Sequence, residues 1–171
     1  MKGIKRLKKG DIVIDCGAHV GIFTLKAAKV GAKVLAIEPD PLNYVLLKMN
    51  IALNGFNNIH VIKVAVGKED KGVEEIIPWG RKTRVPIRSI KSIASEFNLE
   101  HVDFLKMDIE GAEVDAIDGI GELHVRNIAM EYHSYCGKDK VIACLRKMGF
   151  KIAILERGRT GYIFAHKMEL S

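Results

Sequence analysis

One stretch near the N-terminus constrains the fold of this chain more than any other. Residues 12–16 (IVIDC) form an apolar run that predicts a buried strand, and a glycine-containing turn follows from Gly17. After a helix-length segment, residues 34–37 (VLAI) predict a second buried strand that ends at Glu38. Glu38 lies 38 − 15 = 23 positions after Asp15, near the roughly 20 expected for a ribose-binding acid. This arrangement is typical of a βαβ unit that binds adenosine.

The glycine pattern distinguishes between two kinds of cofactor. A turn that binds pyrophosphate reads G-x-G-x-x-G, whereas here His19 stands between Gly17 and Gly21, which argues against a dehydrogenase. Asp15, at the head of the turn, would repel a phosphate. A ligand with an adenosine, no phosphate and a cationic amino-acid tail fits better, and S-adenosylmethionine is such a ligand. The residues expected to bind it lie in the turn and at strand ends: Asp15, Gly17, Ala18, His19, Gly21, Glu38, Pro39, Ala65, Val66 and Asp108.

Size and charge narrow the class of protein. With 171 residues, 48% of them hydrophobic, the chain suits one globular domain over residues 1–171. No apolar run approaches the roughly 20 residues of a membrane span, and the charged N-terminus does not resemble a signal peptide, so we expect a cytoplasmic protein without a membrane partner. The net charge is +6, but aromatic residues make up 6% and are not interleaved with basic ones. A solvated basic surface explains this charge better than a nucleic-acid interface.

Strand-like and helix-like segments alternate along the chain. Apolar runs predict strands over residues 12–16, 34–37, 59–66, 102–107, 127–132, 150–155 and 161–166, and helices over 23–30, 41–54, 90–97, from about 112, and 138–148. Residues 67–88 depart from the alternation and predict a hairpin insertion with short strands at 73–77 and 85–87. Short connections favour right-handed crossovers. We therefore expect an α/β fold with a mostly parallel sheet, helices on both faces and one antiparallel strand at the sheet's end.

In such a sheet the ligand lies beyond the carboxyl ends of the strands, at the point where the strand order reverses. The turn at Gly17 follows the first strand, Glu38 the second and Asp108 the fourth core strand. We expect these three positions to face one crevice.

Residues 103–113 (DFLKMDIEGAE) deliver three carboxylates just beyond a strand: Asp108, Glu110 and Glu113. Acids this close repel one another, which raises at least one pKa unless a cation lies nearby. A sulfonium and an ammonium group would supply that charge. We expect Asp108 to contact the methionine part or to orient the acceptor, and Glu110 to act as a base toward a hydroxyl. Alternatively, Glu110 favours a helix N-terminus and Glu113 is an exposed helix residue.

The third polar group is EYH at residues 131–133, at the end of the next predicted strand. His133 could take a proton from a hydroxyl near neutral pH, which makes it a catalytic candidate. Alternatively, Glu131 and His133 hydrogen-bond each other in a structural role. A metal held by Asp108, Glu110 and His133 is chemically feasible, but no other ligands are evident and we expect none.

At these residues the chain resembles the FkbM-type family of S-adenosylmethionine-dependent methyltransferases. The matching stretches are VIDCGAHVG at 13–21, AIEP at 36–39 and residues 102–113 with their KMDIEGAE core, and residues 131–133 are similar to a later strand of the family. The resemblance covers roughly residues 10–135 and is most specific at 108–113. It implies a Rossmann-like class I methyltransferase fold with a seven-stranded sheet. It also implies O-methylation of a small-molecule or sugar hydroxyl.

A transfer RNA methyltransferase is the second hypothesis. Residues 38–41 (EPDP) and the helix after them are also similar to that group, and the basic charge agrees. However, enzymes that methylate base nitrogens commonly end the fourth strand with an Asn-Pro-Pro-Tyr-like sequence, whereas this chain has DIEG at 108–111. An acidic end repels nucleic-acid phosphate and suits a hydroxyl acceptor better.

A non-catalytic module that binds S-adenosylmethionine is the third hypothesis. Such a module would need Gly17, Gly21 and Glu38 but neither Asp108 nor His133. For the enzyme we expect an in-line displacement, in which the acceptor oxygen attacks the methyl carbon of the sulfonium. Holding the two atoms close and in line would supply most of the catalysis.

Overall fold

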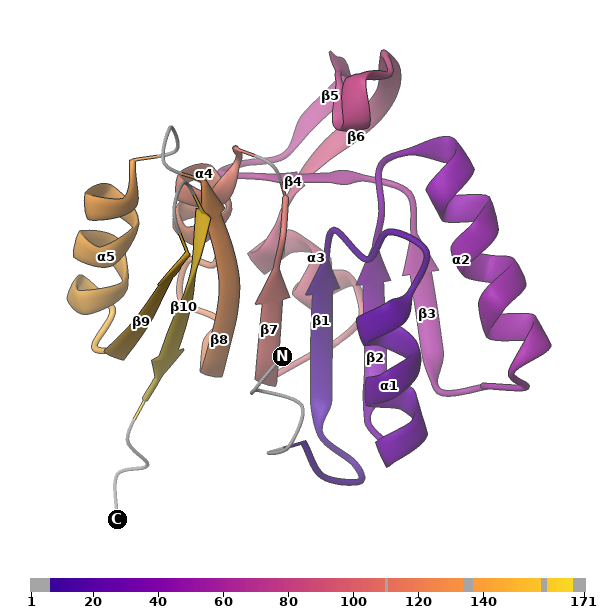
Figure 1. The fold of residues 1–171 in the computed structure, drawn as a ribbon, viewed down its shortest axis with the longest axis horizontal. Helices are drawn as coiled ribbons and strands as arrows, with labels where there is room; N and C mark the ends of the chain where they lie inside the picture. Colours follow the sequence, from indigo (N-terminus) through magenta and orange to yellow (C-terminus); the bar gives the residue numbers. More distant parts are fainter. Residues whose placement is uncertain (1–6, 110, 134–136, 158–159, 168–171) are drawn as a thin grey trace.

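The computed structural model describes residues 7–109, 111–133, 137–157 and 160–167. Seven strands form the central sheet in the order β3-β2-β1-β7-β8-β10-β9 (Figure 1). Their bounds are β1 Ile12–Cys16, β2 Lys33–Ile37, β3 Ile59–Ile62, β7 His101–Met107, β8 His124–His133, β9 Lys151–Arg157 and β10 Thr160–His166. Neighbouring strands are parallel except at β10, which is antiparallel to both β8 and β9. The expected seven-stranded, mostly parallel sheet is confirmed.

The antiparallel strand lies one place in from the edge, whereas the sequence predicted it at the end of the sheet. Strand β9 is the edge strand, and β10 fills the position between β8 and β9. The chain passes from β8 to β9 through helix α5 (Lys138–Lys147). Strand β10 begins three positions after the end of β9 and pairs with it in the antiparallel direction. A strand reached by a short hairpin turn pairs antiparallel with its predecessor, so β10 takes the remaining place beside β8.

The helices cover both faces of the sheet. On one face α1 (Ile22–Val30) packs on Val13, Val34 and Phe104 through Phe23 and two alanines. Helix α2 (Pro41–Leu53) joins it through Leu47, which contacts Ala18 and Ala36. Helices α3 (Ile90–Glu96), α4 (Glu113–Asp118) and α5 pack on the alternate strand residues, such as Ile14, Leu35 and Leu105. This alternation follows from the two-residue period of strands, and it produces a three-layer α/β fold.

Two of the helix starts follow from local sequence. The carboxylate of Asp40 accepts a hydrogen bond from the backbone N–H of Asn43 at 2.9 Å, and Pro41 occupies the first turn of α2. The hydroxyl of Ser89 accepts from the N–H of Ser92 at 3.2 Å and caps α3. Such caps satisfy backbone donors that a helix leaves free at its N-terminus.

A second, three-stranded sheet lies beyond the carboxyl ends of the central strands (Figure 1). It contains β4 (Ala65–Gly67), β5 (Lys71–Ile76) and β6 (Thr83–Ser89) in the order β4-β6-β5, with a short 3₁₀ helix at Pro78–Gly80 between β5 and β6. Strands β5 and β6 are antiparallel, and β4 is parallel to β6. We call residues 71–89 the hairpin.

The sequence predicted one strand over residues 59–66, and this is wrong. Strand β3 is the edge strand of the central sheet, and its ladder with β2 ends at the pair of Ile37 with Ile62. Beyond Ile62 the chain has no partner in the central sheet, whereas β6 offers one to residues 65–67. The backbone donors of residues 65–67 are therefore satisfied in the second sheet, and Ala65 and Val66 belong to β4.

No helix in the described part of the chain combines the length and apolar character needed to cross a membrane.

Candidate functional site

A cavity of about 550 Å³ lies at the carboxyl ends of β1, β2 and β7. Gly17, Glu38 and Asp108, the residues that follow these three strands, all form part of its wall. The order of strands reverses between β1 and β7, so the cavity lies at the switch point where α/β sheets bind ligands. Its volume falls within the usual range for small-molecule sites. The structure thus brings the three strand ends to one cavity.

The turn after β1 brings its backbone directly against the end of β7. Gly17 has a φ of 74°, and a Cβ atom at this position would overlap the carbonyl oxygen of Asp108. The N–H of Asp108 in turn donates to the carbonyl of Cys16 at 3.1 Å. No side chain fits between the two segments, so residue 17 must be glycine for the turn to form the cavity floor.

Glu38 is held rigidly at the end of β2. Its side chain is 1% exposed, its Oε2 accepts from the N–H of His19 at 2.7 Å, and its Oε1 accepts from the N–H of Asp40 at 2.9 Å. Burial raises the pKa of Glu38, and these two backbone hydrogen bonds oppose that rise in part. A carboxylate accepts about four hydrogen bonds, so both oxygens keep capacity for a ligand.

His19 occupies a position where a glycine would be more usual. Its φ is 52°, in the left-handed region that non-glycine residues rarely adopt. This conformation directs its backbone N–H to the Glu38 carboxylate. The turn therefore connects the ends of β1 and β2 without a glycine at position 19, through a backbone hydrogen bond that the glycine pattern does not reveal.

Lys106 lies beneath the turn with its side chain almost fully buried. Its ammonium donates to the carbonyl oxygen of Gly17 at 2.7 Å and lies 3.2 Å from Asp15 Oδ1 and 3.7 Å from Asp108 Oδ2. Burial opposes the charge, but the Asp15 and Asp108 carboxylates outweigh it and raise the pKa of Lys106. The sequence predicted a cation beside Asp108, Glu110 and Glu113 and assigned that charge to a ligand. The protein supplies one itself, which sequence reasoning missed.

Asp15 is fully buried under the turn and does not form part of the cavity wall. The hydroxyl of Thr24 donates to its Oδ2 at 2.6 Å, and Lys106 pairs with its Oδ1. Of the other turn residues predicted to bind a cofactor, Ala18, His19 and Gly21 also lie outside the wall. Their contact with a cofactor stays a prediction, and in this structure they belong to the turn and its support rather than to the wall.

Six of the residues predicted to bind a cofactor do line the cavity: Gly17, Glu38, Pro39, Ala65, Val66 and Asp108. The wall also contains residues that the sequence did not indicate. Ile76, Ile77 and Pro78 reach it from the hairpin, and Ile109 and Asp115 from either side of the turn before α4. No local pattern marks the hairpin residues, because their role depends on where the second sheet lies.

Of the other predicted site residues, the structure describes the side chain of Glu113 but not those of Glu110 and His133. Glu113 is buried, with its Oε1 accepting from the N–H of Gly111 at 3.2 Å, so the alternative of an exposed helix residue is wrong. Glu110 lies outside the described residues, as does the side chain of His133, the last residue of β8. Within the described ranges, no three His, Cys, Asp or Glu side chains gather as metal ligands do.

Comparison with known proteins agrees with this geometry. The chain matches the profile of the methyltransferase FkbM domain over residues 15–152. Methyltransferase sdnD of Sordaria araneosa is 28% identical to it over 87% of this chain and 77% of that protein. A tRNA (guanine(37)-N(1))-methyltransferase of Trichomonas vaginalis is 26% identical over 84% of this chain, which spans 34% of that longer protein.

Among solved structures, ribosomal protein L11 methylase from Lactobacillus delbrueckii subsp. bulgaricus has a TM-score of 0.68 at 22% identity, over 98% of this chain and 77% of that one. This likeness shows the fold, which is that of class I methyltransferases. The matched profile runs from Asp15 at the end of β1 to the start of β9, and so includes the Gly17 turn, Glu38 and Asp108. The protein therefore belongs to the FkbM methyltransferase family.

Proposed function

We propose that this protein is an S-adenosylmethionine-dependent methyltransferase that acts on a hydroxyl oxygen of a small molecule or sugar. The observation that carries the proposal is the Glu38 carboxylate, which is buried, held by two backbone N–H groups and part of the cavity wall. An acid at the end of the second strand accepts hydrogen bonds from ribose hydroxyls in nucleoside-binding α/β folds. Its free lone pairs suit that role.

The rest of the cavity fits a nucleoside that carries a cationic tail. Ala65 and Val66 offer small apolar surface for an adenine, next to Glu38 for the ribose. The wall carries four carboxylates, from Glu38, Glu69, Asp108 and Asp115, against the two ammonium groups of Lys68 and Lys71. This excess of negative charge favours a sulfonium and an ammonium group and disfavours a phosphate. The turn that starts at Gly17 would position the methionine part. The hydrogen bond from Lys106 to the Gly17 carbonyl stabilises the conformation of this turn.

When bound, S-adenosylmethionine supplies an electrophilic methyl group. The task of the chain is then to hold an acceptor oxygen in line with that group and to take up its proton. We assign the orienting role to Asp108. Glu110 follows β7 by three positions in the sequence and His133 ends β8, and we propose one of them as the base.

An RNA methyltransferase is the second candidate. The similarity to a tRNA (guanine(37)-N(1))-methyltransferase and the net charge of +6 favour it. The excess of carboxylates over lysines on the cavity wall counts against it, because a net negative wall repels the phosphates of an RNA that approaches closely. The acceptor is therefore better sought first among small hydroxylated molecules.

The test is a transfer assay with radiolabelled S-adenosylmethionine against a panel of small hydroxylated compounds and sugars and, in parallel, total tRNA. We expect label in the small-molecule arm, and label in the tRNA arm would support the second candidate. The Asp108→Asn variant should lose turnover while its melting temperature changes little, and the exposed Asp118→Asn should retain both.

Binding separates the enzyme from a non-catalytic module. Calorimetry with S-adenosylhomocysteine should show Glu38→Ala weakened by about 1–3 kcal/mol, the magnitude of a lost hydrogen bond to a charged group. Binding of the wild type without transfer to any acceptor would identify the module. If the wild type does not bind S-adenosylhomocysteine at all, the proposal is wrong.

A further inference from the structure

We propose that the hairpin is part of the cofactor site and that Arg81 holds it over the nucleoside end of the cavity. This inference rests on the proposed function, because it assigns a role toward the same cofactor. Arg81 would act as a positioning residue, through the hairpin and through Asp40, without touching the reacting atoms. Three observations support it: the place of the hairpin in the cavity wall, the way its base is fixed, and the contact at its tip.

The hairpin forms part of the same cavity wall as Glu38 and Pro39. Its contribution is apolar, from Ile76, Ile77 and Pro78. Ile77 is 61% exposed although it lines the cavity, so it offers a ligand apolar surface that is in contact with water. A purine base bound beside Glu38 would remove that surface from water, which favours binding.

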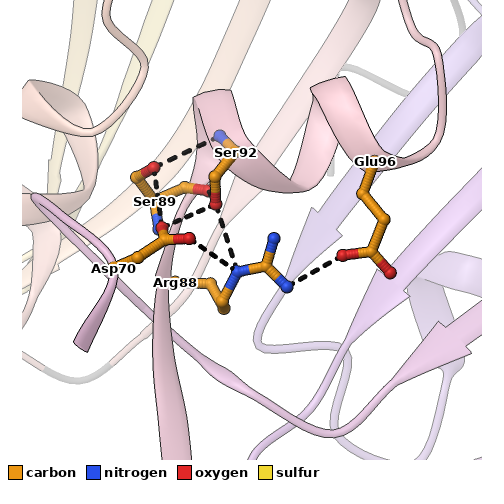
Figure 2. Close-up of polar contacts among 5 residues, drawn as sticks. All are labelled: Asp70, Arg88, Ser89, Ser92 and Glu96. Carbon is orange, nitrogen blue, oxygen red and sulfur yellow. Dashed lines mark hydrogen bonds and ion pairs between the residues drawn. The ribbon is translucent and has the colours of Figure 1, made fainter. Parts of the chain in front are cut away.

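The base of the hairpin is fixed by a polar cluster around Asp70, just before β5 (Figure 2). Asp70 Oδ1 accepts from the N–H of Ser89 at 2.8 Å and from the hydroxyl of Ser92 at 2.6 Å. Arg88 Nε donates to Asp70 Oδ2 at 2.9 Å, and its other end pairs with Glu96 at 2.8 Å. The start of β5, the end of β6 and the first turns of α3 are therefore tied together, and the hairpin extends from a rigid base.

The tip of the hairpin is attached to the start of α2. Just after the 3₁₀ helix, the guanidinium of Arg81 lies 3.3 Å from Asp40 Oδ1, with Arg81 half exposed and Asp40 1% exposed. The N–H of Asp40 donates to Glu38 Oε1. A continuous chain of contacts thus leads from the tip, through Asp40, to the carboxylate proposed to bind the ribose.

The charges at this contact favour the attachment. Asp40 Oδ1 also caps α2, and Oδ2 is buried with no hydrogen bond among the residues that the structure describes. A buried carboxylate with an unfilled acceptor is costly. Arg81 supplies a cation to it, and the ion pair joins the hairpin to the loop after β2. With the contact made, a nucleoside on Glu38 is enclosed. With it broken, the tip can move away from the cavity while the base stays fixed.

The experiment measures release of S-adenosylhomocysteine from the chain of 171 residues by stopped flow. Trp79 is the only tryptophan of the sequence and belongs to the 3₁₀ helix at the tip, so its fluorescence is the readout, with isothermal calorimetry as a second one. We expect Arg81→Ala to release the ligand on the order of three to ten times faster with little change in association rate, since interface changes act mainly on dissociation. Arg81→Lys should recover part of the loss.

The matched control is Arg84→Ala, which removes an exposed arginine from β6 of the same hairpin. It should release the ligand at the wild-type rate. The melting temperatures of Arg81→Ala and Arg81→Lys show whether each variant is folded. We expect both to fold, because the side chain of Arg81 is half exposed. Equal release rates from folded Arg81→Ala, Arg84→Ala and the wild type would overturn the role of Arg81 in holding the hairpin, and would leave the proposed function intact. Failure of the wild type to bind would overturn both this inference and the proposed function.

Discussion

Asp15 and Lys106 form a buried ion pair across neighbouring parallel strands. They are register partners on β1 and β7, and Lys106 Nζ lies 3.2 Å from Asp15 Oδ1. The same ammonium donates to the carbonyl of Gly17, so the pair supports the turn that forms the cavity floor. Buried ion pairs contribute little net stability compared with apolar residues, but the loss of one partner leaves an uncompensated charge.

Replacing Lys106 by methionine is therefore expected to destabilise the protein by about 3–5 kcal/mol, because Asp15 remains buried without its cation. The exposed pair of Lys68 with Asp118 provides the control, and Lys68→Met should cost less than about 1 kcal/mol. Urea denaturation at pH 7 measures both. Equal unfolding free energies for the two variants would show that the buried pair is not what supports the turn.

Gly17→Ala is expected to destabilise the fold by at least about 2 kcal/mol, since it combines a left-handed alanine with an overlap against the Asp108 carbonyl. Gly55 separates the two effects. It also has a left-handed backbone, with a φ of 67°, but nothing lies within 4 Å of its would-be Cβ atom. Gly55→Ala should therefore cost only the conformational part, about 1 kcal/mol. Thermal unfolding of both variants measures the difference, and a Gly17 variant no less stable than the Gly55 variant would contradict the close contact.

Binding of S-adenosylhomocysteine should weaken as the pH falls, at a higher pH than for an ordinary glutamate. Burial raises the pKa of Glu38 above 4.5, and the protonated form offers the ribose hydroxyls a poorer acceptor. Affinity is thus full above the raised pKa and is lost as the pH falls through it. Calorimetry between pH 7 and pH 4.5 should show this loss, and Glu38→Gln should bind more weakly with a flat profile over the same range. The exposed Glu75→Gln is the control and should behave like the wild type.

The cluster around Asp70 predicts an acid-sensitive contribution to stability. Although partial burial opposes it, hydrogen bonds from Ser92 and Ser89 and the charge of Arg88 lower the pKa of Asp70 to about 2. A folded-state pKa below the unfolded value of 3.8 stabilises the protein above pH 4, and this stabilisation disappears as the pH falls toward 2.

Asp70→Asn should therefore be less stable than the wild type at pH 5, and the difference should narrow steadily toward pH 2. Melting temperatures across this range test it. Glu122→Gln, at an exposed position, should parallel the wild type throughout. A constant difference between Asp70→Asn and the wild type would show that the carboxylate charge is not involved.

Much of the fold could be predicted because its signals are local. Strand β1 has the bounds that its apolar run indicated, and α2 begins where Asp40 and Pro41 predict a start. Strand β8 is longer than expected, since His124 and Val125 pair with β7 and a pairing partner is not visible in the strand's own residues. For the same reason β4 was merged with β3: its place depends on β6, more than twenty residues further along the chain.

The sequence contains a signal that predicts the role of Lys106 as a buried partner of an acid. Lys106 stands in the apolar run before Asp108, and Asp15 stands in the apolar run of β1. When both strands are buried, each of these charged side chains needs a partner. Two opposite charges in neighbouring strands predict such a pair. What remained hidden was the register that places them side by side.

The sequence alone determined the order of elements, the glycine turn, and the acids at the ends of the strands, because strand period, caps and turn residues act over a few positions. Only the tertiary structure decided which groups share the cavity. The left-handed His19 directs its N–H to Glu38, Lys106 reaches under the turn, and the hairpin closes one side. These contacts join residues up to 89 positions apart, as between Gly17 and Lys106, and they depend on the register and packing of whole elements.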